Sequence, residues 1–260
     1  MPQIQTQRFK TSRSVLALIL REMSTTYGRS PGGYIWAVLE PIGAIAILSI
    51  GFSLLLRAPS LGTSFPLFYA TAYLPLNYFS STSNKTAKAI RFSKSLLAYP
   101  RIGWMDPILA RWILNGLTQI MVAYLILAGI MYFEGTRTLL DFPKLVISFS
   151  LAAFLGLGVG SLNAVLFGLF PVWEQMWNIV SRPLVLLSGL FYIYEDLPTM
   201  AQDILWWNPL MHISGMFRAG FYSTYDALYT SVAYVSGFSG ITTVLGLLFM
   251  RQYFREIISR

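Results

Sequence analysis

The run LVISFSLAAFLGLGVGSLNAVLFGLF, at residues 145–170, decides the class of fold. It contains no Asp, Glu, Lys or Arg. It is also longer than the roughly 20 apolar residues that a helix needs to cross the hydrocarbon layer of a membrane. A helix on the surface of a soluble domain would carry polar residues on its outer face. The run therefore predicts a membrane-spanning helix and, with it, an all-α membrane protein.

The composition extends this prediction to the whole chain. Of its 260 residues, 55% are apolar and 12% are charged, about half the charged share of an average soluble domain. The absence of cysteine excludes a disulfide framework, cysteine-ligated zinc and iron–sulfur clusters. A single histidine, His212, excludes a histidine-rich metal site. We therefore expect no metal bound by this chain.

Five more runs are apolar enough to be spans, which gives six predicted transmembrane helices. In chain order they cover residues 33–56, 65–83, 108–133, 145–170, 177–194 and 231–250. We read residues 33–250 as one membrane domain, preceded by a segment at 1–32 and followed by a tail at 251–260. Residues 1–32 lack an apolar run long enough for a cleavable signal peptide, so we expect the chain to begin in the cytoplasm.

Residues 197–222 are too polar to span a membrane and too apolar for an ordinary loop. Asn208-Pro209 interrupts them, and proline disfavours helix at the residue before it. We expect a re-entrant hairpin of two half-helices before the last span. Broken backbone is tolerated at membrane depth only where protein or water satisfies it.

The basic residues predict the orientation. With the N-terminus inside, the only Lys and Arg residues outside, among 19 in the chain, are Arg57, Arg137, Lys144 and Arg218. Cytoplasmic loops carry such an excess of positive charge. Both termini and the loop at 84–107 are therefore expected in the cytoplasm. The formal net charge of +8 then reflects topology, and nucleic acid is not needed to explain it.

Motifs for enzymatic chemistry are missing. The chain has no GxxxxGK[ST] phosphate loop and no visible nucleophile–base–acid set, so we assign no catalytic residue. Glu40 and Arg182 are the ionisable residues expected within spans, where a charge normally faces the bundle interior or a partner. A structural ion pair or a lipid headgroup contact would explain both. Transport and structural roles remain.

Residues 9–27 predict an amphipathic helix. Its apolar face would consist of Phe9, Leu16, Leu20, Met23 and Tyr27, and Leu18 would interrupt the polar face. Such a helix would lie flat on the cytoplasmic leaflet. There it would either touch a partner or serve only as a lipid anchor.

The loop at 84–107 combines basic and apolar residues. Lys85, Lys88 and Arg91 recur every three residues, and Phe92, Leu96 and Leu97 follow. A cluster that only fixes topology would not need the apolar side chains. We expect a helix that leaves the membrane, turns and returns, as a docking element for a cytoplasmic protein.

Three motifs together resemble those of a known family. They are YGRSPGGYIWAVLEP at 27–41, RPLVLLSGLFY at 182–192, and WNPLMH at 207–212 followed by FRAGF at 217–221. They look like the entry into the first helix, the signature in the fifth helix and the segment outside the membrane of the type 2 ABC export permeases. Within that family they most resemble the capsular polysaccharide exporters of Gram-negative bacteria. The resemblance covers about residues 15–255.

This resemblance implies a homodimer in the bacterial inner membrane, bound to two copies of a separate ATPase subunit that holds ATP and Mg²⁺. The chain itself would bind no cofactor. Periplasmic and outer-membrane export proteins and membrane lipid would be further partners. The coupling helix would lie in the loop at 84–107, which makes these the expected coupling residues: Arg91, Lys94, Ser95, Leu96, Leu97, Tyr99, Pro100 and Arg101.

The resemblance also implies that a lipid-linked polysaccharide passes between the two copies and that the hairpin at 197–222 forms an outer gate. Sugar C–H faces pack on aromatic rings, so we expect the path and gate to include Tyr192, Tyr194, Trp206, Trp207, Arg218 and Arg57. Some of the aromatics would instead belong to an ordinary membrane-interface belt. For Arg218, an ion pair with Asp203 or Glu195 is weighed against an anionic substrate.

Other functions fit the same skeleton. O-antigen and teichoic-acid permeases share it, and a small-molecule or drug exporter of this permease type is a further alternative. A membrane scaffold that transports nothing is a third hypothesis. Co-purification of an ATPase would separate the scaffold from the transporters.

Overall fold

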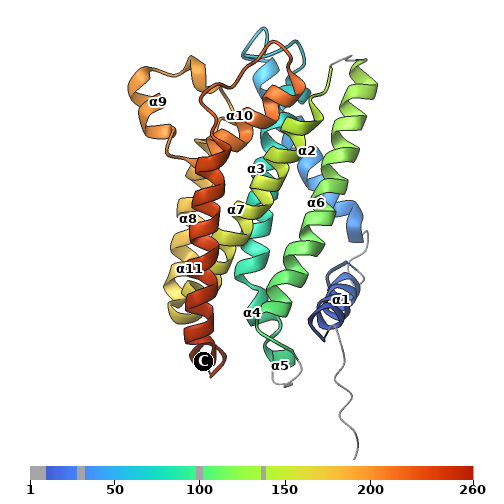
Figure 1. The fold of residues 1–260 in the computed structure, drawn as a ribbon. Helices are drawn as coiled ribbons and strands as arrows, with labels where there is room; N and C mark the ends of the chain where they lie inside the picture. The colour runs from blue at the N-terminus through green and yellow to red at the C-terminus, as the bar shows by residue number, and fades with distance from the viewer. Residues whose placement is uncertain (1–9, 28–32, 98–101, 136–138, 260) are drawn as a thin grey trace, which may run out of the picture.

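The structure, a computed structural model, describes residues 10–27, 33–97, 102–135 and 139–259, and the regular structure in these ranges is helical. The longest helices run side by side as a bundle (Figure 1). They are α2 (Gly33–Ser53), α3 (Phe65–Ala87), α6 (Met105–Glu134), α7 (Phe142–Leu169), α8 (Pro171–Leu186) and α11 (Val232–Ser259).

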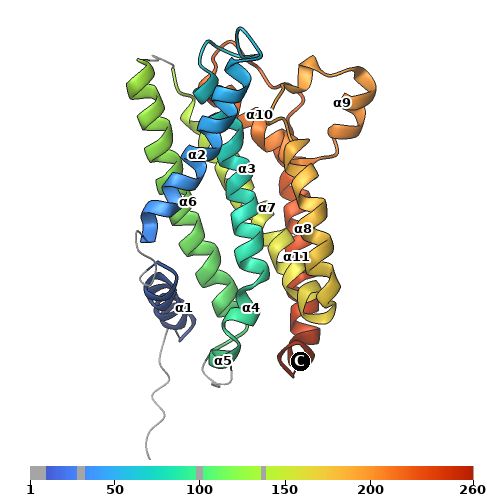
Figure 2. The ribbon, with the colours of Figure 1, turned by 180° about the vertical axis from the view of Figure 1, so that it is seen from behind.

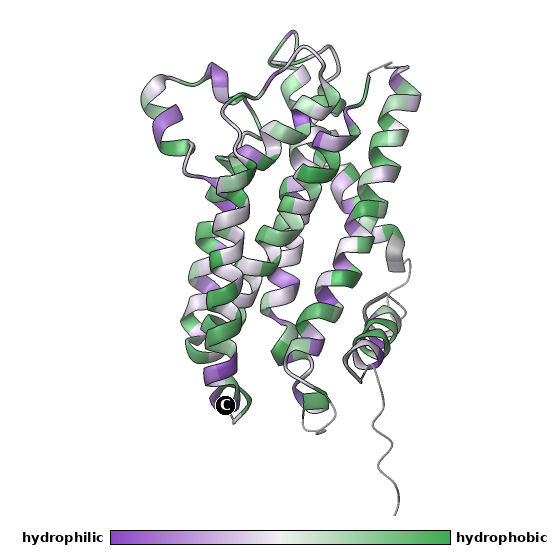
Figure 3. Ribbon diagram, viewed as in Figure 1, coloured by the Kyte–Doolittle hydropathy of each residue, from purple (hydrophilic) through white to green (hydrophobic). Residues whose placement is uncertain are grey.

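Four of these helices are long and apolar enough to cross a membrane, namely α2 through Ile35–Ser53, α6, α7 and α11. Hydrophobic residues run along them, and hydrophilic residues gather toward the ends of the bundle (Figure 3). The other two long helices are not among these four. Helix α3 ends in the polar sequence SSTSNKTA, and α8 has only 16 residues. The all-α membrane class is thus confirmed, and four of the six expected spans are supported by length and composition.

Caps and special residues set where the helices begin and end. The Ser64 hydroxyl accepts a hydrogen bond from the Leu67 amide at 3.0 Å, which caps the start of α3. The Asp141 carboxylate does the same for the Lys144 amide at the start of α7, at 3.3 Å. Helix α6 ends at Gly135, whose φ of 61° favours glycine.

Helix α7 lies at the centre and packs along α3 and α11. Its glycines explain how closely these helices approach. A Cβ atom at Gly160 would lie 2.8 Å from the Ser83 carbonyl oxygen of α3, and one at Gly246 of α11 would lie 2.6 Å from the Leu162 amide of α7. Small residues at such crossings let helix backbones pack tightly in membranes.

The bundle has two distinct ends. One end carries α1 (Lys10–Glu22), α4 (Ala89–Phe92), α5 (Lys94–Leu97) and the C-terminal end of α11, and we call it the α5 end (Figure 1). The opposite end carries α9 (Thr199–Leu205) and α10 (Pro209–Phe221), and we call it the α9 end. The expected docking loop and the expected hairpin therefore lie at opposite ends.

The predicted bounds of the fifth helix are wrong. It was expected at 177–194, but α8 begins at Pro171 and ends at Leu186. A turn follows, in which Gly189 has a φ of 80°, so the apolar residues beyond it do not continue the helix. The expected tail at 251–260 is helical through Ser259, as the end of α11.

The N-terminal helix is present, and the side expected to be polar packs on the bundle. Helix α1 packs against α6 through Val15 and Leu18, which are both buried, whereas Leu16, Leu20 and Met23 are exposed. Leu18, expected to interrupt a polar face, is the most buried of these side chains. A short π-helix at Met23–Tyr27 follows α1. Phe9 lies outside the described residues, and so does the side chain of Tyr27.

Candidate functional site: the α5 end and the α9 end

The predicted coupling residues lie at the tip of the α5 end. Two single-turn helices, α4 and α5, extend past the end of α3. Arg91, Lys94 and Ser95 are exposed, and Leu96 and Leu97 are half-buried. Tyr99, Pro100 and Arg101 lie outside the described residues. The tip therefore offers basic and apolar side chains together on one surface.

Arg111 of α6 fixes this segment from inside. Its Nε lies 3.0 Å from a carboxylate oxygen of Glu22 in α1, and its Nη1 donates to the Lys85 carbonyl of α3 at 3.1 Å. Its guanidinium also stacks on the Phe92 ring of α4, 4.1 Å from the ring centroid. One buried cation thus joins α1, α3, α4 and α6. Sequence reasoning missed it, although Arg111 is a charge inside the expected span at 108–133.

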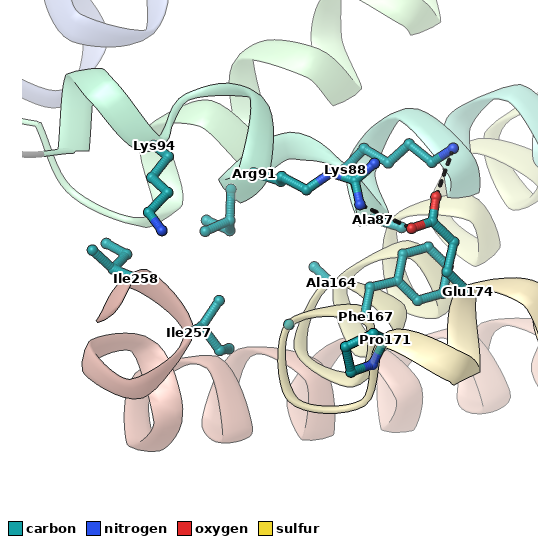
Figure 4. Close-up of a pocket in the computed structure, with 12 residues that line it drawn as sticks. Ala87, Lys88, Arg91, Lys94, Ala164, Phe167, Pro171, Glu174, Ile257 and Ile258 are labelled. Atoms are coloured by element: carbon teal, nitrogen blue, oxygen red, sulfur yellow. Dashed lines mark hydrogen bonds and ion pairs between the residues drawn. The ribbon is translucent and has the colours of Figure 1, made fainter. Parts of the chain in front are cut away.

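Glu174 of α8 joins the same segment from the other side. Its two carboxylate oxygens meet Lys88 Nζ at 3.1 Å and Arg91 Nη1 at 3.0 Å (Figure 4). Of the three basic residues that recur at 85, 88 and 91, Lys88 and Arg91 both pair with Glu174.

A pocket of about 270 Å³ opens beside these ion pairs. Lys88, Arg91 and Lys94 form one wall, and Ile257 and Ile258 at the end of α11 form another (Figure 4). Helix α8, the segment at 88–94 and the C-terminal helix therefore meet around one cavity.

The expected hairpin at 197–222 has the predicted break. Helix α9 ends at Leu205, and α10 begins at Pro209. The Asn208 side chain accepts from the Leu210 amide at 3.1 Å and donates to the Ser188 hydroxyl at 2.9 Å. The described side chains of α10 after Pro209 are buried against α3 and α7, whereas α9 has none that is buried. The second half of the hairpin belongs to the core of the bundle, and the first half lies outside it.

Arg218 of α10 does not pair with an acid among the described residues, so the ion pair with Asp203 or Glu195 that we considered from the sequence is not formed there. Its side chain is 1% exposed, and it donates to the carbonyls of Tyr192 at 2.7 Å and Leu190 at 3.3 Å. The guanidinium lies 4.1 Å from the centroid of the Phe68 ring. Of the two acids considered, Glu195 accepts from the Tyr225 hydroxyl at 2.8 Å, and Asp203 is exposed. Arg218 thus holds the turn after α8 against α3 and α10.

The single histidine is structural in this arrangement. His212 Nε2 lies 2.7 Å from the Trp206 carbonyl, and its Nδ1 lies 3.2 Å from the Ser231 amide. The amide can only donate, so Nδ1 accepts and Nε2 carries the proton. Both ring nitrogens are used, and the ring ties the break in the hairpin to the start of α11.

The other residues expected in the path lie at the α9 end without forming one site. The hydroxyls of Tyr192 and Tyr194 donate to the carbonyls of Leu187 and Gln202, and the Trp206 indole donates to the Tyr229 carbonyl. Trp207 is 68% exposed, and Arg57 is exposed in the loop after α2. The polar atoms of Tyr192, Tyr194 and Trp206 are therefore used in hydrogen bonds within the protein.

Within the described ranges, no group of three His, Asp or Glu side chains could hold a metal ion. The contacts at the two ends connect helices to one another. At the α5 end, ion pairs tie the basic segment to α8, and Arg111 of α6 contacts Phe92 of the tip and pairs with Glu22 of α1. At the α9 end, α10 is buried against the bundle.

Comparisons with known proteins agree with this architecture. The model of the family described as ABC-2 type transporter matches residues 13–222. The chain is 31% identical over 239 residues to the polysialic acid transport protein KpsM of Escherichia coli, and the alignment covers 92% of each chain.

Two further relatives are named as capsule polysaccharide export inner-membrane proteins. BexB of Haemophilus influenzae is 25% identical over 246 residues, which cover 94% of this chain and 92% of BexB. CtrC of Neisseria meningitidis serogroup B is 25% identical over the same length, with the same coverage. The similarity thus extends over nearly the whole of each protein.

Proposed function

Because this chain belongs to the ABC-2 type transporter family, we propose that it is the membrane-spanning subunit of an ATP-driven exporter that moves lipid-linked capsular polysaccharide across the bacterial inner membrane. The observation that carries this proposal is the 31% identity to a polysialic acid transport protein over 92% of both chains. The names of the other relatives favour a capsule polymer over an O-antigen, a teichoic acid or a small molecule.

In this proposal the α5 end faces the cytoplasm. Basic residues are concentrated there, including Lys88, Arg91, Lys94, Arg251 and Arg255, and the α9 end has few. The positive-inside rule supports the orientation. Helix α1 would lie at the cytoplasmic interface, with the exposed Leu16 and Leu20 toward lipid. Residues 197–222 would dip into the outer leaflet as a re-entrant hairpin, and α3 and α8 would be the two remaining spans.

The exposed tip formed by α4 and α5 would dock on the ATPase subunit. That partner would bind ATP and Mg²⁺ and hydrolyse the nucleotide, and this chain would bind no cofactor and catalyse no reaction. Movement of the tip would reach α8 through Glu174, which pairs with Lys88 and Arg91. It would reach α1 through Arg111, which contacts Phe92 of the tip and pairs with Glu22.

Two copies of the chain would face each other across the export path, with two ATPase subunits below. Helix α8 has no buried residue, and α2 exposes Ile35, Leu39, Ile42 and Ile47, so both have apolar faces free for a second copy. The hairpin would close the outer exit, where Trp207 and Arg57 remain available to the polymer. Periplasmic and outer-membrane export proteins would then carry the polymer to the cell surface.

Deletion of the gene tests the proposed function. We expect loss of surface capsule with accumulation of polymer inside the cell, and recovery with the intact gene. The tagged subunit should also co-purify with an ATPase, which an idle scaffold would not do. Normal capsule in the deletion strain would overturn the proposal.

Replacement of Lys94–Leu97 by Gly and Ser tests the docking tip. We expect the variant to insert normally and to lose the ATPase on purification. The matched control replaces the exposed Met200 and Ile204 of α9 by Ser, at the opposite end. Full ATPase recovery with the tip variant would show that the docking surface lies elsewhere.

A further inference from the structure

One face of α3 stays uncovered, and that face is polar. Between Leu67 and Ala87 the side chains are buried except for a few positions, and the half-buried Tyr73, Asn77, Ser80, Ser81 and Asn84 make up most of these. They recur at steps of three and four residues, so they lie on one side of the helix. From Tyr73 to Asn84 the stripe extends about 16 Å along the axis, roughly half the hydrocarbon thickness.

Two cavities flank this stripe. One, of about 500 Å³, lies between α2, α3 and α6 and is lined by Glu40, Thr118 and Gln119 among others. The other, of about 390 Å³, lies between α3 and α8 and includes Ser181 and Arg182. Asn77 and Ser80 line both. Seen from behind, α3 stands between α2 and α8 (Figure 2).

The stripe has hydrogen-bonding capacity that the described part of the chain does not use. Ser81 binds Asn115 at 2.9 Å, but the side chains of Asn77, Ser80 and Asn84 make no hydrogen bond with other described residues. Glu40 and Arg182 form no ion pair within the same ranges, so the structural pair considered from the sequence is not formed there. Unpaired polar groups facing lipid are costly, so this face requires water, a ligand or a second protein surface.

We infer that the stripe Tyr73–Asn77–Ser80–Asn84 lines the export path and hydrogen-bonds the hydroxyl groups of the passing sugar chain. The inference rests on the proposed function and adds to it a binding surface on α3. Amide and hydroxyl side chains both donate and accept, as sugar hydroxyls do. Because these side chains are uncharged and repeat along the axis, each contact is weak and replaceable. Passage through a pore requires such weak, multiple sites.

The rival occupant of the stripe is a second copy of the chain. Ser and Asn side chains also hydrogen-bond across helix interfaces in membranes. In that case α3 would meet α3 directly, and the stripe would be dry. Access of water to the stripe therefore distinguishes the two.

The chain lacks cysteine, so Asn77→Cys and Ser80→Cys can be probed in the full exporter with a charged thiol reagent that reaches both membrane faces. A thiol reacts as the thiolate, which forms in water and not in lipid. We expect both to be labelled at least tenfold faster than the controls Leu117→Cys and Ile120→Cys, on the exposed apolar face of α6. Labelling no faster than the controls, or a disulfide between two copies at residue 77, would overturn the inference.

Export provides the second test. We expect Asn77→Leu with Ser80→Ala to lower capsule export about tenfold at an unchanged amount of subunit and ATPase, and Asn77→Gln to keep most of it. Ile120→Leu is the matched control. Normal export by the double variant, in cells whose export still depends on the gene, would refute the inference about the stripe. It would leave the proposed function in place.

Discussion

The guanidinium of Arg111 and the carboxylate of Glu22 lie 3.0 Å apart, and their side chains are 8% and 13% exposed. This pair joins α1 to α6. Around it, Val15 and Leu18 pack near Ala110 of α6. The N-terminal helix is thus joined to the bundle beside the docking segment.

Glu22→Gln should therefore loosen α1. The change leaves a buried guanidinium without its counter-charge, which costs about 3 kcal/mol, the lower end of the range for buried pairs. We expect a lower unfolding temperature in detergent and faster proteolysis within α1. Arg13→Ala, at an exposed position of the same helix, is the control. An unchanged unfolding temperature would show that the apolar contacts alone hold α1.

Glu174 gives a different prediction, because its partners are partly exposed. Surface ion pairs contribute about 1 kcal/mol or less to stability, so Glu174→Gln should fold normally. It should nevertheless separate ATP hydrolysis from export, since α8 loses its connection to Lys88 and Arg91. We expect hydrolysis to remain within twofold of normal while export per ATP falls several-fold.

Charge exchange provides the control for this prediction. Glu174→Lys combined with Lys88→Glu and Arg91→Glu should recover part of the export, and Gln175→Ala should have no effect. If Glu174→Gln changes neither export nor its ratio to hydrolysis, the ion pairs are incidental.

The substitution Arg218→Ala should reduce the amount of folded subunit. The carbonyls of Leu190 and Tyr192 would lose their donors, and each such loss costs about 1–3 kcal/mol. Gln, which can donate to one carbonyl, should be intermediate. Fluorescence-detected size exclusion measures the folded fraction. A fully folded Arg218→Ala protein that no longer exports would instead assign the side chain to the substrate.

The orientation has a direct test at Ser95, an exposed residue of α5. Ser95→Cys should be labelled by an impermeant thiol reagent in inside-out vesicles and not in intact cells. A cysteine at exposed Met200 of α9 should behave in the opposite way once the outer membrane is permeabilised. Labelling of Ser95→Cys from the outside of intact cells would contradict the proposed orientation.

The sequence predicted what apolar runs and prolines determine. The long apolar run at 145–170 matches α7 within three residues at its start, and Asn208-Pro209 marks the break between α9 and α10. Gly189 shows the limit of this reasoning. Hydropathy continues past it, and only the backbone turn reveals that α8 has ended.

The side-chain partners could not be predicted, because they depend on which helices are neighbours. Arg218 finds carbonyls in place of an acid, and Leu18 faces inward because α6 lies against that side of α1. The stripe on α3 has a sequence signal, since polar residues recur at helical spacing within a span. Only the structure shows that the other faces of α3 are buried and that the polar face is the one left uncovered.

The measurement that tests the central claim most directly is transport in inside-out membrane vesicles that contain this subunit and its ATPase. Lipid-linked capsular polysaccharide is presented at the outer surface of the vesicles, and a glycosidase then removes whatever has not entered. The account predicts polymer protected from the enzyme when ATP is supplied, and none with a non-hydrolysable analogue or without this subunit. Equal protection with and without ATP, or with and without the subunit, would contradict it.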